Sequence, residues 1–116
     1  MGEGMANWVY DSAQSGLLTV FKDYEVEELK CLWGREKEAS SREVWMAVNH
    51  VMGEGSISRA SIINSLNRMV EFGVLKYSEV TGKGGHRGLY TPALNEGQLK
   101  KFIESSLKEH MTLNLV

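Results

Sequence analysis

The residues best suited to contacting another molecule lie in the segment 56–75, SISRASIINSLNRMVEFGVL. If this segment forms a helix, one side is apolar and the other carries mostly serine, asparagine and arginine. Asparagine can pair with adenine and arginine with guanine through two hydrogen bonds each, and serine can bond to a base edge or a phosphate. The alternative is a helix whose polar side only contacts solvent. Serine and asparagine weaken a helix interior, so these residue types are disfavoured on a helix face that has no function. The pattern therefore favours contact with double-stranded DNA.

A second candidate is the segment 81–88, TGKGGHRG, which has four glycines in eight residues. Glycine permits a flexible turn, and the basic side chains of this one are Lys83, His86 and Arg87. Such a loop can approach a phosphate backbone closely, although a surface turn that happens to be basic is the alternative. The segment lacks the residue spacing of a phosphate-binding nucleotide loop. In addition, its glycines follow a strand and do not lead into a helix.

The charge of the chain is unevenly distributed. The 116 residues have a formal net charge of −2, with 42% apolar and 24% charged residues, which is typical of one globular domain. Residues 1–55 carry a net charge of −5, whereas residues 56–92 carry five basic and two acidic side chains. If the basic side chains share one surface, their local field favours a polyanion as partner.

Cellular location and redox state follow from what the sequence lacks. No apolar run approaches the ~20 residues that a membrane span needs, so we expect no membrane partner and a cytoplasmic protein. The single cysteine, Cys31, excludes an internal disulfide framework. We interpret Cys31 as a small internal hydrophobe, with a redox-sensing thiol as the alternative.

The sequence does not favour an enzyme. No histidine and cysteine set has zinc spacing, no serine-centred nucleophile motif occurs, and the acidic residues 25, 27 and 28 are interpreted as charges at a helix start. We therefore predict no catalytic residue, no metal and no cofactor. The histidines lie on different predicted elements: His50, His86 and His110.

Periodicity predicts the elements that hold these segments. Asp23 is the expected N-cap of the first helix, Ser40 and Glu43 form a capping box for the second, and Ser58 caps the third, which ends before Gly73. Beyond Gly73 the apolar period changes to two, which indicates strands. The predicted elements are helices over 23–36, 40–55 and 58–72, strands over 74–80 and 89–94, and a final helix capped by Asn95.

Each predicted helix has an apolar stripe that is expected to face the core. Residues 1–22 show no clean period, so a short helix and a short strand both stay open there. The stripes are Val26, Leu29, Leu32 and Trp33, then Val44, Val48, Val51 and Met52, then Ile62, Leu66, Met69 and Val70, and finally Leu99, Phe102, Ile103, Leu107 and Met111.

This order of elements predicts an α+β, mostly α fold. Two helices joined by a glycine-containing turn form a helix-turn-helix, and the hairpin that follows makes it a winged helix with a two-stranded wing and flanking terminal elements. In such a fold the third helix enters the major groove and the hairpin reaches the backbone or the minor groove. The expected domains are an N-terminal extension over 1–22, a winged-helix domain over 23–94 and a C-terminal helix over 95–116.

Four stretches also resemble a known family. They are YEVEELKCLW (24–33), ASSREVWMAVN (39–49), SRASIINSLNRMVEFGVL (58–75) and GHRGLYTP (85–92). Across residues 22–94 the chain is similar to the penicillinase-repressor family of winged-helix transcriptional regulators, which includes the β-lactamase and methicillin-resistance repressors.

The resemblance implies a sequence-specific repressor that binds inverted-repeat operators as a homodimer. The family dimerises through a C-terminal helical region, and here apolar residues gather at both ends: Trp8, Val9, Leu17, Leu18 and the 99–111 stripe. The positions that match the family's DNA-contacting helix are Arg59, Ser61, Asn64, Ser65 and Arg68.

One alternative function stays open. Winged helices also serve as protein-interaction modules, and the acidic first half of the chain would suit a basic partner.

Overall fold

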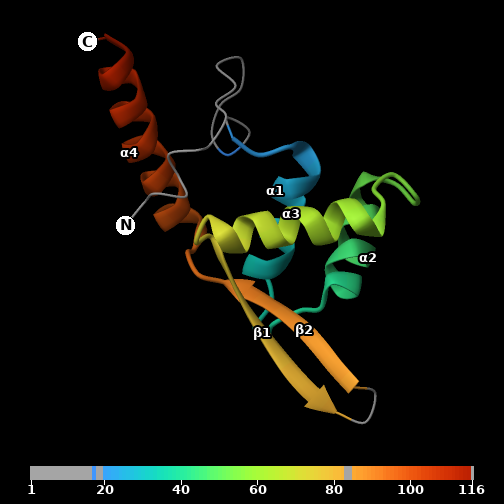
Figure 1. The fold of residues 1–116 in the computed structure, drawn as a ribbon. Coiled ribbons are helices and arrows are strands. Elements are labelled where there is room, and N and C mark those ends of the chain that lie inside the picture. The colour runs from blue at the N-terminus through green and yellow to red at the C-terminus, as the bar shows by residue number, and fades with distance from the viewer. Residues whose placement is uncertain (1–16, 18–19, 83–84, 116) are drawn as a thin grey trace.

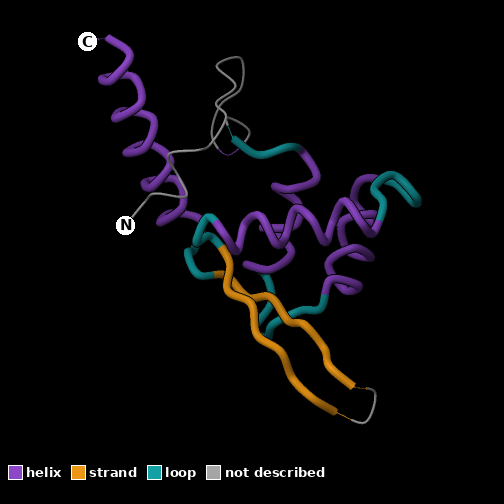
Figure 2. The backbone as a smooth tube through the Cα atoms, viewed as in Figure 1, coloured by secondary structure: helices purple, strands orange, loops and turns teal. Residues whose placement is uncertain are grey.

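The computed structural model describes residues 17, 20–82 and 85–115, without the side chains of residues 107 and 109–115. Three helices form the body, a two-stranded hairpin extends from it, and a fourth helix leads away from it (Figure 1). Figure 2 shows the same path, in which α3 crosses the body and passes directly into the hairpin. Of the predicted extension over 1–22, residues 1–16, including Trp8 and Val9, lie outside the described residues, as do Leu18 and Thr19.

The first two helices begin with a glutamate that accepts a bond from the N-cap backbone, and in α2 this is part of a full capping box. Helix α1 covers Asp23–Trp33, and its N-cap is Lys22 rather than the expected Asp23. Helix α2 covers Ser41–Met52, and the predicted Ser40–Glu43 capping box is present, with bonds of 3.2 and 3.0 Å. Helix α1 ends three residues earlier than predicted, and α2 ends at Met52, directly before Gly53. In α2 the reason is Gly53, whose φ of 113° takes the chain out of the helical region.

Helix α3 covers Arg59–Glu71, and its N-cap is Ser58, as predicted: the side-chain oxygen accepts a bond from the Ser61 N–H at 3.1 Å. Gly73 follows with a φ of 81°, which ends the helix in the expected way. Helix α4 covers Glu96–Leu115, and Asn95 caps it by accepting a bond from the Gln98 N–H at 2.8 Å.

The hairpin is longer than the sequence predicts. Strand β1 covers Leu75–Gly82 and pairs antiparallel with β2, Gly85–Pro92, in a register that runs to a Gly82–Gly85 pair. The expected loop over 81–88 was therefore wrong: strand pairing uses backbone groups, which glycine also supplies. His86 and Arg87 consequently lie on β2 rather than in a loop.

The core lies where the four helices meet the base of the hairpin. Most predicted stripe residues are buried there, but Val51 is 63% exposed and Met52 37% exposed, which corrects their assignment to the core. The inward position in the last turn of α2 belongs instead to Asn49. Its side chain accepts a bond from the Ile57 N–H at 2.9 Å and donates to the Ile57 carbonyl at 3.2 Å.

Two contacts fix the hairpin to the body. Ala39, just before α2, exchanges backbone hydrogen bonds of 3.0 and 2.8 Å with Tyr90 on β2. The Trp33 indole N–H at the end of α1 donates to the Leu94 carbonyl at 2.9 Å. The wing is thus held against both α1 and α2. No helix in the described part of the chain is both long and apolar enough to cross a membrane.

Candidate nucleic-acid interface

The outer face of α3 carries the polar residues that the sequence singles out. Arg59 and Asn64 are exposed, and Ser61 is half-buried, its hydroxyl oxygen 2.9 Å from that of the cap residue Ser58. The first turn of α3 contains no acidic residue. Its free N–H groups and the positive end of the helix dipole therefore act with Arg59 to favour a negatively charged group.

Ser65 does not belong to this face, which corrects the expectation that it contacts DNA. It is only 3% exposed, and its hydroxyl lies 2.9 Å from a carboxyl oxygen of Glu25 and also bonds to Glu28. The physical reason is helical spacing: Ser65 follows Ile62 by three positions, so it shares the inward face of α3. A serine on that face needs a buried partner, and α1 supplies two.

Arg68 lies at the edge between the outer face and the interior. Its side chain is 45% exposed, and one guanidinium nitrogen donates to the Glu25 carboxylate. A guanidinium has five N–H donors, so this bond leaves others to face outward while it restrains the orientation of the side chain.

The two glutamates behind α3 are not simple helix-start charges, which corrects their interpretation. Glu25 does cap α1 by accepting a bond from the Lys22 N–H at 2.9 Å, yet it is only 1% exposed, and Glu28 is 0% exposed. Burial raises the pKa of Glu28 to about 8, against a weaker lowering by the Ser65 hydrogen bond. The sequence does indicate the burial of these two glutamates, because residues 25, 28, 29 and 32 follow the three-to-four spacing of an inward-facing helical stripe.

A basic hollow of about 380 Å³ lies where the N-termini of α2 and α3 meet the wing. Arg42 from α2, Arg59 from α3, and His86 and Arg87 from β2 line it, together with Ser40, Ser41 and Gly88. The first N–H groups of α2 have no partner within the helix, so backbone donors and cations meet there. Sequence reasoning missed Ser41 and Arg42 because no local pattern connects the start of α2 to the wing.

The hollow is partly neutralised at one side. The Glu43 carboxylate forms two ion pairs: one oxygen lies 2.8 Å from a guanidinium nitrogen of Arg35, and the other lies 3.6 Å from one of Arg87. A hydrogen bond from the Ser40 backbone holds the pKa of Glu43 below its usual value, so this residue is ionised at neutral pH. Arg42 and Arg59 therefore carry the larger share of the positive potential.

The wing is coupled to the outer face of α3. The Tyr90 hydroxyl donates to the Asn67 side-chain oxygen at 2.7 Å, and the rings of Tyr77 and Tyr90 pack with centroids 5.1 Å apart. Of the predicted wing residues, His86 and Arg87 line the basic hollow together with Arg59 of α3. Lys83 lies outside the described residues.

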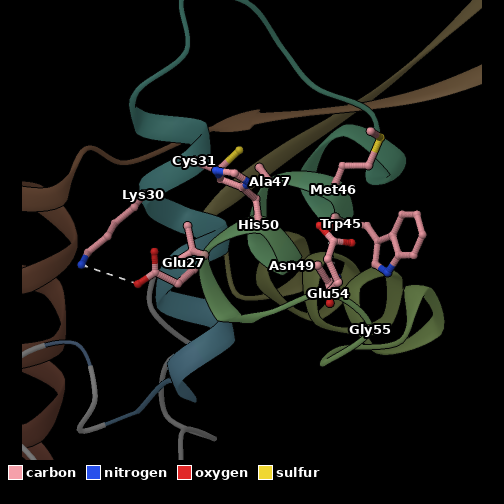
Figure 3. Close-up of a pocket in the computed structure, with 11 residues that line it drawn as sticks. Glu27, Lys30, Cys31, Trp45, Met46, Ala47, Asn49, His50, Glu54 and Gly55 are labelled. Atoms are coloured by element: carbon pink, nitrogen blue, oxygen red, sulfur yellow. Dashed lines mark hydrogen bonds and ion pairs between the residues drawn. The ribbon is translucent and has the colours of Figure 1, made fainter.

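A second recess, of about 660 Å³, lies between α1 and α2 (Figure 3). Its walls include the exposed side chains of Met46 and Val51, 55% and 63% exposed, and the Trp45 ring, whose N–H donates to the Ile57 carbonyl at 3.0 Å. Cys31 also lines it, and burial raises the pKa of the thiol, which disfavours the reactive thiolate. This supports the interpretation of Cys31 as a small hydrophobe.

Among the described residues, no group of three or more histidine, cysteine or acidic side chains is arranged to hold a metal ion. The titratable groups near α3 instead form hydrogen bonds and ion pairs to one another.

Comparison with known proteins gives a likeness to solved structures. No family model and no curated protein matches the chain. A solved structure of a PadR family transcription regulator from Clostridium difficile superposes with a TM-score of 0.51 at 19% identity, over 80% of this chain and 92% of that chain. The likeness does not single out the penicillinase-repressor family that the sequence resembles. It confirms the predicted fold: the chain is a winged helix of mostly helical content, like that regulator.

Proposed function

We propose that the protein is a sequence-specific, double-stranded DNA-binding transcription regulator. The observation that carries the proposal is the convergence of three segments on one surface. The start of α2, the start of α3 and strand β2 bring three arginines and a histidine around one hollow, beside the acid-free start of α3. Arg87 is paired with Glu43, but Arg42 and Arg59 have no ion-pair partner among the described residues, so their meeting at one hollow favours a polyanion as partner.

The geometry supports different roles for two groups of residues, one that contacts phosphates and one that contacts bases. The hollow suits a phosphate, because backbone N–H groups and guanidinium groups both donate to its oxygens. With a phosphate held there, Asn64 and Arg68 lie further along α3 and are the residues that would contact base edges in the major groove. Asn64 is exposed, and Arg68 is held at the edge of the same face.

We further propose that the regulator acts as a cytoplasmic homodimer on an inverted-repeat operator and represses transcription. The resemblance to the penicillinase-repressor family supports the repressor role. Helix α4 supports dimerisation: Leu99 and Ile103 in its first half pack on the core, while the rest leads away from the body (Figure 1). Together with residues 1–22 it is the proposed contact between subunits, and two-fold symmetry would place two α3 helices about one DNA turn apart.

The proposal is tested by binding to fluorescently labelled duplexes at several salt concentrations. Removal of one cation that neutralises a phosphate should reduce the slope of log affinity against log salt by about 1. Arg42→Ala and Arg59→Ala should both show this reduction. The matched control is Lys30→Ala, which removes one positive charge from the other recess, where Lys30 lies 3.8 Å from Glu27. Absence of wild-type binding to any duplex at low salt would refute the proposal.

A protein-interaction module is the second candidate. The exposed Met46 and Val51 on the α1–α2 recess favour it, because large apolar side chains grouped on one surface mark contact sites. Replacement of both by serine should leave the DNA affinity of a regulator unchanged, because the basic hollow lies elsewhere. A wild-type chain that retains no duplex at low salt, but binds a protein partner that the double variant loses, would favour the interaction module.

A further inference from the structure

The buried cluster behind α3 has an unusual arrangement of donors and acceptors. Glu25 accepts bonds from the Lys22 N–H, from the Ser65 hydroxyl and from Arg68, so its carboxylate has three donors. Within the described part of the chain, the Glu28 side chain forms one hydrogen bond, to Ser65 through one carboxyl oxygen. Its other oxygen is buried without a hydrogen-bond partner among the described residues.

The Ser65 hydroxyl lies between the two carboxyl groups but has a single proton to donate. If it donates to Glu25, its oxygen can only accept from Glu28, and Glu28 must then carry a proton. The opposite direction would leave Glu28 ionised, with one buried oxygen unpartnered, next to an ionised Glu25. Two buried carboxylates in contact with one hydroxyl strongly favour protonation of one of them. The member with three donors remains ionised, and that member is Glu25.

We propose that Glu25 is a positioning residue that fixes Arg68 on the DNA-contacting helix, and that a proton on Glu28 maintains this arrangement. The chain of hydrogen bonds runs from the Glu28 acid to the Ser65 oxygen, from the Ser65 hydroxyl to Glu25, and ends on Arg68. Loss of the Glu28 proton places a second negative charge in the cluster and removes the bond from Glu28 to the Ser65 oxygen, which breaks the chain. Sequence recognition by α3 is therefore linked to pH, an inference that rests on the proposed DNA-binding function.

Glu28 is the group of this cluster that changes charge in the range between pH 7 and pH 9. Its surroundings are Tyr24, Glu25 and Cys31 from α1, Arg68 from α3 and Tyr90 from β2. Burial raises the pKa of Tyr24, Tyr90 and Cys31 above their ordinary values, so the two tyrosines stay neutral over the range and ionisation of the Cys31 thiol is moved to higher pH. The pKa of Glu28, raised to about 8 by burial, falls inside it.

The test uses Glu28→Gln, which has the shape of the neutral acid and can donate to Ser65 but cannot ionise. Affinity for a selected duplex site is measured by fluorescence anisotropy at pH 7, 8 and 9, with a random duplex as the non-specific reference. Wild-type affinity for the selected site should fall by about fivefold or more from pH 7 to pH 9, the lower end of typical coupling between sites. Glu28→Gln should bind as the wild type does at pH 7 and keep that affinity at pH 9. Glu25→Gln should reduce the preference for the selected site at every pH.

Equal pH profiles in wild type and Glu28→Gln would overturn the proposal, because all other titrating groups are common to both proteins. A second measurement does not depend on DNA: the carbon NMR shifts of the Glu28 carboxyl and the Arg68 guanidinium are followed from pH 6 to pH 9.5. Both should change with one midpoint near the Glu28 pKa, and the Arg68 change should be absent in Glu28→Gln. If no duplex binds, the proposed function is refuted. If the Arg68 chemical shift does not change at the midpoint of the Glu28 titration, the positioning role itself is refuted.

Discussion

Removal of the Glu28 carboxyl group should change how the stability of the protein depends on pH. A carboxyl group whose pKa is higher in the folded than in the unfolded state binds its proton more tightly when folded. Its stabilising contribution is complete below the unfolded pKa, near 4.5, and is lost as pH rises through the folded pKa of about 8. Wild-type stability should therefore decline over this range, whereas Glu28→Gln has no proton to lose.

The size of the effect follows from the difference in pKa. A rise from 4.5 to about 8 corresponds to roughly 4 to 5 kcal/mol across the whole range, or about 1.4 kcal/mol per pH unit within it. This is a large fraction of the ~5–15 kcal/mol by which domains are typically stable. Complete burial of Glu28 means that little solvent screening reduces it.

The assay is urea unfolding of both proteins at whole pH values from 5 to 9. The difference in unfolding free energy should be small at pH 5 and should grow in favour of Glu28→Gln up to about pH 8, then level off. Glu27→Gln is the matched control, since it changes the same residue type on α1 outside the buried cluster, and its profile should parallel that of wild type. A constant difference between wild type and Glu28→Gln at every pH would refute the reasoning.

Three further predictions concern the interface and its support. Arg59→Ala should weaken binding to all duplexes and lower the salt slope by about 1, because its charge lies in the basic hollow; an unchanged slope would remove it from the interface. Asn64→Ala should cost ~1–3 kcal/mol at the selected site only, which competition with random DNA measures, and equal losses on both would exclude base contact. Asn49→Ala should lower the unfolding free energy by ~1–3 kcal/mol, because the Ile57 N–H loses its buried partner; thermal unfolding that matches wild type would contradict this.

The helices, the wing and the outer face of α3 could be predicted because local rules control them. The Ser40–Glu43 capping box, the Ser58 cap and the change to period two after Gly73 all depend on residues within a few positions of one another. The structure confirms these features, and the fold that they imply follows from short connections between neighbouring elements.

The interior of the site could not be predicted, since it depends on pairs that the sequence holds far apart. The polar type of Ser65 predicts a surface position, yet its place on α3 is inward and its partner Glu28 lies 37 positions away. The helical spacing of each residue is that of an inward position, but only the packing of α1 against α3 shows that the two side chains become partners. Arg42 was missed for the same reason, because its relation to Arg87 exists only through the fold.

The central claim is that this winged helix recognises specific duplex DNA through α3 and the basic hollow. It is tested most directly by selection of bound sites from a random duplex library with the wild-type protein at low and at physiological salt. We expect an enriched inverted repeat whose half-sites are about one helical turn, ~10 base pairs, apart, with affinity that falls steeply as salt rises. Recovery of unenriched sequences, with no duplex retained even at low salt, would contradict the claim.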